Sequence, residues 1–158
     1  GRNEKRIALI LNFAHQSQAI DTSFVRGIVL HGELVYFPSA HPLRAVFKEK
    51  KVVHGKVIPR GYEHVSHLLN EYASTLGNNP WLEDFPAIWE KATPARVNEA
   101  WILKDAQGFA LPLPASHPAL WELFALGGGN PLTVFGTWNG FTFTPLAAWE
   151  AERLVNLL

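Results

Sequence analysis

The sequence of 158 residues contains no cysteine, and this absence excludes several kinds of chemistry. Disulfide bonds, thiolate nucleophiles, iron–sulfur clusters and cysteine-ligated zinc all need that side chain. Small secreted domains often depend on disulfides, so the composition also favours a cytoplasmic protein. Methionine is missing as well and the chain begins at Gly1, from which we expect a fragment excised from a longer protein.

An excess of one charge and a long apolar run are also missing. Fourteen basic residues balance fourteen acidic ones, so no net field draws the molecule toward nucleic acid or an anionic membrane. The apolar run near the start, "IALIL", is far shorter than the roughly 20 residues of a membrane-spanning helix, and we expect no membrane association. The length and the 47% apolar fraction predict one globular domain, 1–158, or two closely packed lobes, 1–60 and 61–158.

The first lobe, 1–60, has the pattern of an antiparallel β-meander. The β-rich run 6–14 predicts a buried strand, and 27–38 predicts a second strand that Gly32 interrupts with a bulge or a close backbone approach. Over 43–50 apolar and charged residues alternate, which predicts a third strand with one face in solvent.

The middle of the chain is predicted to be helical. Residues 62–76 place apolar side chains at helical spacing, and Gly77 follows as a stop signal. The Asn-Pro pair at 79–80 favours the start of a shorter helix over 81–92, whose regularity Pro86 limits.

Strand signals return in the last third. Residues 97–113 predict two strands joined by a turn at Asp105–Gly108, and the Asn-Gly pair at 139–140 is a strong hairpin signal between two β-rich runs. The tail, 147–158, is compatible with a helix or with another short hairpin. The fold class is therefore α+β, with antiparallel strands from both ends of the chain and a central helical segment.

Three successive glycines, 127–129, are the one feature that looks like a ligand-binding motif. A phosphate-binding loop places its glycines before a helix, whose N-terminal amides then bind the anion. Here the glycines follow a helix predicted over 118–126, which Ser116 can cap, so the pattern matches a helix end before a hairpin. The Gly-Lys-Ser/Thr and GxGxxG patterns are both missing, and we expect no phosphate site.

The chain contains three unusual strings, "RIALILNF", "GELVYFPSAHPLRAVFKEK" and "LFALGGGNPLTVFGTWNGFTFTPLAAW". Together they resemble a region of the bacterial SWIM zinc-finger proteins outside the finger, although the finger's own Cys-x-Cys and Cys-x-His pattern is missing, so no zinc site is carried over. The resemblance implies the accessory region of a cytoplasmic bacterial protein, from a family whose members tend to be encoded beside MoxR-type ATPases and von Willebrand A-domain proteins. It also favours the hairpin for the tail.

Two histidines, His64 and His67, lie three residues apart on the predicted helix, with Glu63 and Glu71 on either side of His67. Side chains at this spacing can hold a metal ion together. They also flank an apolar stripe, where solvent-exposed His–Glu pairs are common, and no third ligand cluster can be named. We predict no cofactor and no metal, with these two histidines as weak candidates.

No motif predicts an enzyme. The Gly-x-Ser-x-Gly signature of serine hydrolases is missing, and Ser39 with His41 would need an acid from elsewhere to form a triad. A hydrolase of unknown substrate is therefore only a third interpretation.

The segment 44–60 has the one marked charge asymmetry, with a single acid, Glu49, among its cations. A basic segment beside a strand can contact a phosphate backbone, so nucleic-acid binding is the alternative function. Lysines at strand ends also prevent edge pairing, and the neutral net charge favours that explanation. The basic residues are Arg44, Lys48, Lys50, Lys51, Lys56 and Arg60.

The six tryptophans are many for this length. Trp101, in an apolar strand, and Trp121, on an amphipathic helix, are predicted to lie in the core. Trp81 stands at a helix start and Trp138 before a hairpin turn, so we expect both to be partly exposed. Exposed aromatic side chains on a neutral surface are typical of a protein contact or, less favoured here, a sugar platform.

Two stretches combine aromatic side chains with turn-forming residues, "YFPSAHP" at 36–42 and "TWNGF" at 137–141. Prolines and tight turns reduce the ordering entropy lost on binding, which makes an aromatic anchor effective; the alternative is that these aromatic residues close the core. We predict a non-catalytic protein-interaction module of a larger bacterial protein, of undetermined oligomeric state, which the SWIM resemblance places in an assembly with a MoxR-type ATPase and a von Willebrand A-domain protein. The candidate partner-binding residues are Tyr36, Phe37, Trp81 and Trp138.

Overall fold

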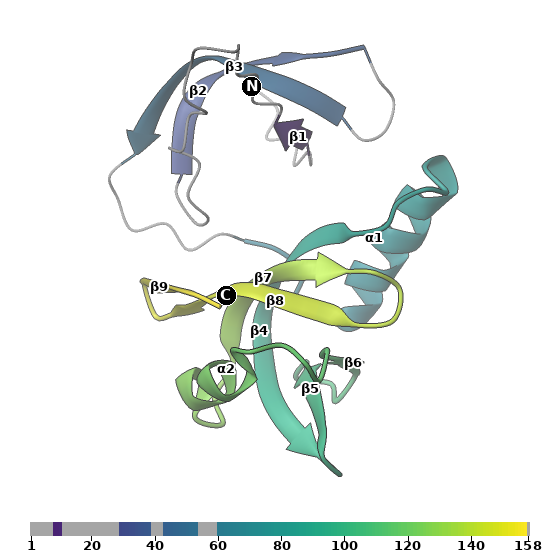
Figure 1. Cartoon of the computed structure of the whole chain (residues 1–158), viewed down its shortest axis with the longest axis vertical. Helices are drawn as coiled ribbons and strands as arrows, with labels where there is room; N and C mark the ends of the chain where they lie inside the picture. The colour runs from purple at the N-terminus through teal and green to yellow at the C-terminus, as the bar shows by residue number, and fades with distance from the viewer. Residues whose placement is uncertain (1–7, 11–28, 39–42, 54–59, 158) are drawn as a thin grey trace. The chain divides into compact units, whose positions relative to one another are not determined.

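The computed structural model describes residues 8–10, 29–38, 43–53 and 60–157. By its internal contacts the chain divides into two compact units, 1–55 and 56–158. The described residues form two helices and nine strands in two sheets, and all strand pairs but one are antiparallel (Figure 1). The α+β fold class is therefore confirmed. Neither helix of the described chain has the length and apolar character needed to cross a membrane.

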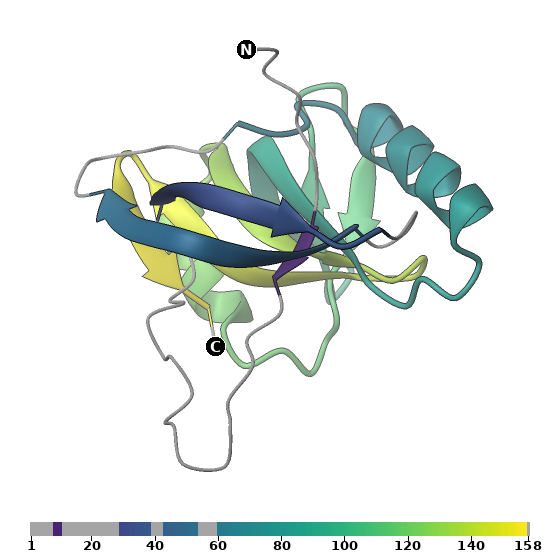
Figure 2. The same ribbon diagram turned by 90° about the horizontal axis from the view of Figure 1, so that it is seen from above.

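The first unit holds a three-stranded sheet in the order β1–β3–β2. Its strands are β1 (Ala8–Ile10), β2 (Val29–Tyr36) and β3 (Leu43–Val53). β2 and β3 lie side by side as a long antiparallel hairpin (Figure 2), whereas β1 pairs with β3 in parallel. The prediction of a simple antiparallel meander is therefore wrong. A parallel pair needs a long crossover connection, and the chain between β1 and β3, which includes β2, is long enough for one.

Gly32 marks a close approach of β2 and β3, as the sequence suggests. A Cβ atom at this position would overlap the backbone carbonyl oxygen of Glu49. The register also shifts between Glu33 and Leu34, which is the irregularity expected of a bulge.

The second unit begins with α1 (Val65–Asn78), which runs one residue past the predicted stop at Gly77. The helix predicted over 81–92 is wrong, because β4 (Phe85–Val97) occupies that stretch. Its buried residues alternate with partly exposed ones from Phe85 to Glu90, which is the period of a strand with one face in the core. The helical middle therefore consists of α1 alone.

A six-stranded sheet, in the order β6–β5–β4–β7–β8–β9, forms the framework of this unit. The other elements are β5 (Ala100–Lys104), β6 (Ala110–Pro112), α2 (Leu120–Gly127), β7 (Leu132–Trp138), β8 (Phe143–Glu150) and β9 (Arg153–Asn156). Both predicted hairpins, around 105–108 and 139–140, are confirmed. The tail is a hairpin too, since β9 pairs with β8.

The triple glycine ends α2, as expected. Gly127 is its last residue, and Gly128 follows in the left-handed region, with φ of 52°, where glycine avoids the strain of a Cβ atom. The proposed cap at Ser116 is wrong, because the N-cap is Ala119 and no side chain caps the helix there. His117 lies nearby, and its Nδ1 accepts a hydrogen bond from the Ala119 backbone N–H (3.3 Å).

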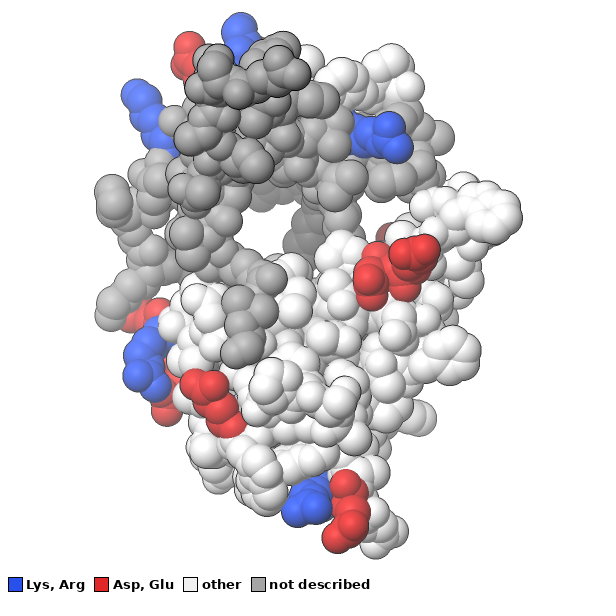
Figure 3. All heavy atoms as spheres, in the orientation of Figure 1, with Lys and Arg blue, Asp and Glu red and all other residues white. Residues whose placement is uncertain are grey.

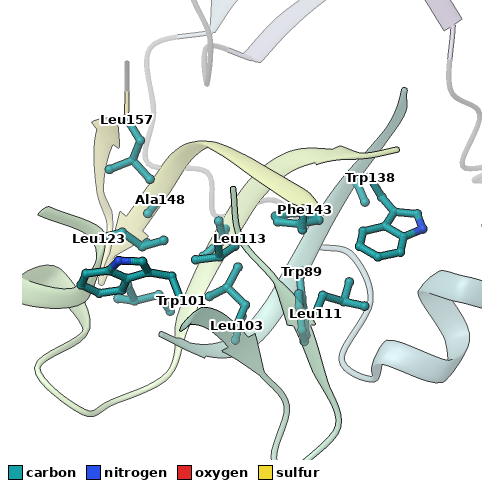
Figure 4. Close-up of a cluster of buried hydrophobic side chains, with 14 of the residues drawn as sticks. Trp89, Trp101, Leu103, Leu111, Leu113, Leu123, Trp138, Phe143, Ala148 and Leu157 are labelled. Atoms are coloured by element: carbon teal, nitrogen blue, oxygen red, sulfur yellow. The ribbon is translucent and has the colours of Figure 1, made fainter. Parts of the chain in front are cut away.

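The core of this unit is formed by the sheet together with α1 and α2. Figure 4 shows Trp89, Leu103 and Phe143 among the side chains that gather there. Trp89 is fully buried and meets Phe143 edge to face, with ring centroids 6.0 Å apart, an arrangement that aromatic pairs favour. The core therefore draws on elements from the whole length of 56–158.

Candidate interaction surfaces

Three consecutive apolar residues at the end of β2 are exposed, and we name them the strand-end patch. Val35, Tyr36 and Phe37 are 46%, 42% and 41% exposed. The Phe37 backbone N–H donates to the carbonyl oxygen of Arg44 (2.8 Å), so hairpin bonding continues past the end of β2. Tyr36 and Phe37 are therefore exposed, as a partner contact requires, and pairing with β3 fixes their backbone.

The predicted basic residues lie partly on the same hairpin. Lys48 forms an exposed ion pair with Glu33, with Nζ 3.2 Å from Oε2. Arg44, Lys51 and Arg60 are also exposed. Lys56 and the side chain of Lys50 lie outside the described residues. Because Lys48 is already paired with an acid, the hairpin is less basic than the sequence of 44–60 suggests.

Charged side chains in the described part of the second unit form small separate groups on the face that Figure 3 shows. Two of the described ion pairs, Lys91–Glu63 and Arg153–Glu150, join side chains of opposite charge. Exposed pairs of this kind contribute little to stability and create no field of one sign.

Trp138 is buried, with 6% of its surface exposed, so its prediction as an exposed partner contact is wrong. Its ring meets that of Tyr72 on α1 edge to face, with 6.5 Å between centroids. The exposed aromatic residue of this hairpin tip is Phe141 (81%). Asn139 Oδ1 accepts the backbone N–H groups of Phe141 and Thr142, and this tight turn leaves Phe141 outside the sheet.

Trp81 is 89% exposed, as the sequence predicts. It lies in the connection between α1 and β4 rather than at a helix start. The next residue, Leu82, packs against the core and donates its backbone N–H to the Asn79 carbonyl oxygen (3.1 Å). The connection is therefore anchored while Trp81 points to solvent. Of the four predicted contacts, Tyr36 and Phe37 belong to the first unit and Trp81 and Trp138 to the second.

A second exposed aromatic group was missed by the sequence reasoning. Trp121, predicted to lie in the core, is 62% exposed. The buried positions of α2 are Leu120, Leu123 and Gly127, spaced by three and four residues, and this spacing places Trp121 on the outer side. That period was available in the sequence, but the aromatic character of Trp121 obscured it.

Trp121 belongs to a cluster that we name the aromatic–arginine platform. Its ring meets that of buried Trp101 edge to face at 4.7 Å and that of Phe124 at 6.4 Å. The Arg96 guanidinium carbon lies 5.3 Å from the ring centroids of both Trp101 and Trp121, within the range of cation–π attraction. The platform consists of Arg96, Trp101, Trp121 and Phe124.

His64 and His67 are neighbours at the start of α1, with ring centroids 5.5 Å apart. Glu63 is engaged elsewhere, because Lys91 hydrogen-bonds to it (2.9 Å) and thereby lowers the pKa of its carboxyl group. Within the described ranges no set of three potential metal ligands comes together. Of the hydrolase candidates, Ser39 and His41 lie outside the described residues.

The surroundings of His117 predict that the stability of the fold depends on pH. Burial lowers the pKa of its imidazole, although a hydrogen bond with the Pro145 backbone partly opposes this, and Nδ1 must be unprotonated to accept the Ala119 N–H. The contribution of His117 to stability is thus complete above the unfolded pKa of about 6.5 and is lost as the pH falls below it toward the folded pKa. We expect thermal unfolding to show a smaller loss of stability on acidification in His117→Gln than in the wild type. An NMR titration of His117 at or above its ordinary pKa would contradict this.

No family model matches this chain, and no curated protein or solved structure proved similar to it. The likeness to the SWIM proteins therefore stays a prediction from the three strings of residues quoted above.

Proposed function

We propose that this chain is a non-catalytic protein-interaction module of a larger cytoplasmic bacterial assembly, and that the strand-end patch is its contact with a partner. One observation carries this proposal. Val35, Tyr36 and Phe37 are all exposed by more than two fifths, although successive residues of a strand point to opposite faces of a sheet. A strand that covers a core buries at least one of its faces, so this end of β2 has apolar side chains available on both.

The patch also has the properties of an effective anchor. Tyr36 pairs with Ala45 and Val35 with Val46 across the hairpin, so its backbone is ordered before binding. Ordering costs at an interface fall when the binding segment is already fixed. Aromatic side chains are enriched in the small set of residues that dominate protein–protein affinity. These features support a protein partner that covers apolar side chains.

The partner follows from the resemblance to the SWIM proteins. Members of that family tend to be encoded beside a MoxR-type ATPase and a von Willebrand A-domain protein, and we propose one of these two as the partner of the strand-end patch.

The test is co-purification of the tagged full-length protein with its two neighbours, identified by mass spectrometry. We expect Tyr36→Ala/Phe37→Ala to lose the bound neighbour, because truncating a central aromatic anchor typically costs about 2 kcal/mol or more of binding free energy. Phe141→Ala is the matched control, since it removes an exposed phenylalanine from the second unit.

The melting temperature separates the possible outcomes. Loss of the neighbour in the double variant alone, at an unchanged melting temperature, supports the proposal. Undiminished co-purification in the double variant, or equal loss in the control, would contradict it.

A further inference from the structure

The guanidinium group of Arg96 is held in one orientation by the aromatic–arginine platform, but it has no close acceptor among the described residues. Its guanidinium stacks on two indole rings, and its closest carboxylate, that of Glu99, is 3.9 Å away on a side chain that is itself almost fully exposed. In the described part of the chain, Arg96 makes no hydrogen bond. A planar fork of N–H donors held in one orientation fits a carboxylate, which it can bind through two parallel hydrogen bonds.

The surroundings of Arg96 add an apolar requirement. Trp121 and Phe124 are exposed beside it, and Arg96 and Trp101 are direct cross-strand partners in the β4–β5 hairpin. A ligand that uses the whole platform therefore combines a carboxylate with a large apolar side chain near it.

The chain itself presents this combination in residues 81–84, which we name the acidic tryptophan segment. Trp81 is the most exposed large apolar residue among those described. Glu83 and Asp84 follow it, are exposed, and have side chains without an ion pair or hydrogen bond in the described structure. Leu82 fixes the segment to the core, so little ordering is needed before it binds.

In one molecule the two surfaces lie at opposite ends of β4. The acidic tryptophan segment ends where β4 begins, and Arg96 lies next to the last residue of β4. At about 3.3 Å per residue, the strand between Asp84 and Arg96 spans roughly 40 Å along its path. Figure 1 shows β4 running from the α1 side of the sheet to its turn with β5.

We propose that the aromatic–arginine platform of one molecule binds the acidic tryptophan segment of a second copy of this chain. A carboxylate of Glu83 or Asp84 pairs with Arg96, and Trp81 packs on Trp121. Each copy carries one surface at either end of β4, so the contact is head-to-tail and propagates unless the rotation closes a ring. The few side chains involved make a small interface, which is typical of weak association.

Sedimentation of the full chain, from low micromolar to near-millimolar concentration, tests this proposal. We expect the wild-type mass to rise with concentration. Two variants each remove one side of the contact: the platform variant is Arg96→Gln/Trp121→Ala, and the segment variant is Trp81→Ala/Glu83→Gln/Asp84→Asn. Each should self-associate at least about tenfold more weakly than the wild type, because it loses one charged hydrogen-bonded pair. Arg153→Gln is the control, because that exposed arginine is already paired with Glu150.

Mixing the two variants is the most specific step. Each variant keeps the surface that the other lacks, so a mixture has one intact contact and should form dimers and nothing larger. A wild type that is monomeric at every concentration, self-association as strong as that of the wild type in either variant alone, or a mixture without dimers would overturn the proposal.

A labelled peptide of residues 79–84 provides a measurement that does not depend on folding of the variants. Its fluorescence anisotropy should rise when the wild-type chain is added. A peptide with Gln and Asn in place of Glu83 and Asp84 should bind with an affinity at least about tenfold lower. Equal binding of the two peptides would overturn the role of Arg96. Both experiments leave the strand-end patch untouched, so their failure is distinct from failure of the proposed function.

Discussion

Asp105→Ala is expected to lower the free energy of unfolding by about 3 kcal/mol, because it removes a buried carboxylate that three backbone groups use. Asp105 is 4% exposed and is the one buried charged side chain in the described part of the chain. Its Oδ1 accepts the N–H groups of Gln107 (2.9 Å) and Phe109 (3.0 Å), and its Oδ2 accepts that of Val65 (3.1 Å).

The third bond is the one that links distant elements. Val65 is the first residue of α1, and the N-cap residue His64 gives the helix no side-chain cap. Asp105 thus caps α1 from the β5–β6 turn, forty positions away in the sequence, and its charge also favours the positive end of the helix dipole. Without it, the Val65 N–H is left unpaired in the interior, which is more costly than the loss of an average hydrogen bond.

Chemical denaturation measures this effect, with two companion variants. Asp105→Asn retains one acceptor oxygen and should fall between the wild type and the alanine variant. Gln107→Ala removes only an exposed side chain of the same turn and should stay within about 0.5 kcal/mol of the wild type. Asp105→Ala with a stability as close to wild type as Gln107→Ala would refute the capping role.

The same substitution at two glycines is expected to have opposite effects. A Cβ atom at Gly136 in β7 would overlap the carbonyl oxygen of Thr144 and lie 2.6 Å from a ring carbon of fully buried Phe143. Neither neighbour is the far end of a flexible chain, so we expect Gly136→Ala to destabilise by about 2–3 kcal/mol, as overpacked core positions do. Gly77, in contrast, lies within α1 with nothing within 4 Å of the added atom.

At Gly77, alanine should stabilise the protein by about 0.5–1 kcal/mol, because it restricts the unfolded chain and favours the helix. Thermal or denaturant unfolding of the two variants, measured side by side, shows whether the free energy of unfolding falls in Gly136→Ala and rises in Gly77→Ala. A Gly136→Ala variant as stable as the wild type would show that β7 and β8 do not pack as described, and a destabilised Gly77→Ala would show the same for the end of α1.

The parts of the fold that the sequence predicts are those set by local chemistry. The Asn-Gly pair at 139–140 fixes the β7–β8 hairpin, and the glycines after 126 end α2, because both depend on backbone conformations that few other residues adopt. The helix predicted over 81–92 is wrong, although Phe85, Ala87 and Trp89 alternate as in a half-buried strand. Asn79 and Pro80 gave a local start signal for a helix that the sheet overrides.

The surfaces were less accessible to sequence reasoning than the hairpins. The exposure of Trp81 is expected from a helix start, but the residue lies in the connection between α1 and β4. On the β7–β8 hairpin, Trp138 packs against Tyr72 of α1, whereas Phe141 is exposed. The aromatic–arginine platform joins β4, β5 and α2, so no single stretch of sequence contains it. The Asp105 contact with Val65 is equally non-local. From the sequence, an aspartate in a turn is expected to hydrogen-bond to the backbone of that same turn and not to a distant helix.

Binding of the purified full-length protein to a purified MoxR-type ATPase and a purified von Willebrand A-domain protein, the two partners proposed from the SWIM resemblance, tests the interaction function most directly. In a biolayer titration, at least one of the two should bind the wild type and Phe141→Ala with the same Kd. Tyr36→Ala/Phe37→Ala should raise that Kd by a factor of about thirty, which corresponds to the roughly 2 kcal/mol of a truncated aromatic anchor. A Kd that is the same for the wild type and both variants, or no binding of the wild type to either proposed partner, would contradict the function proposed for the strand-end patch.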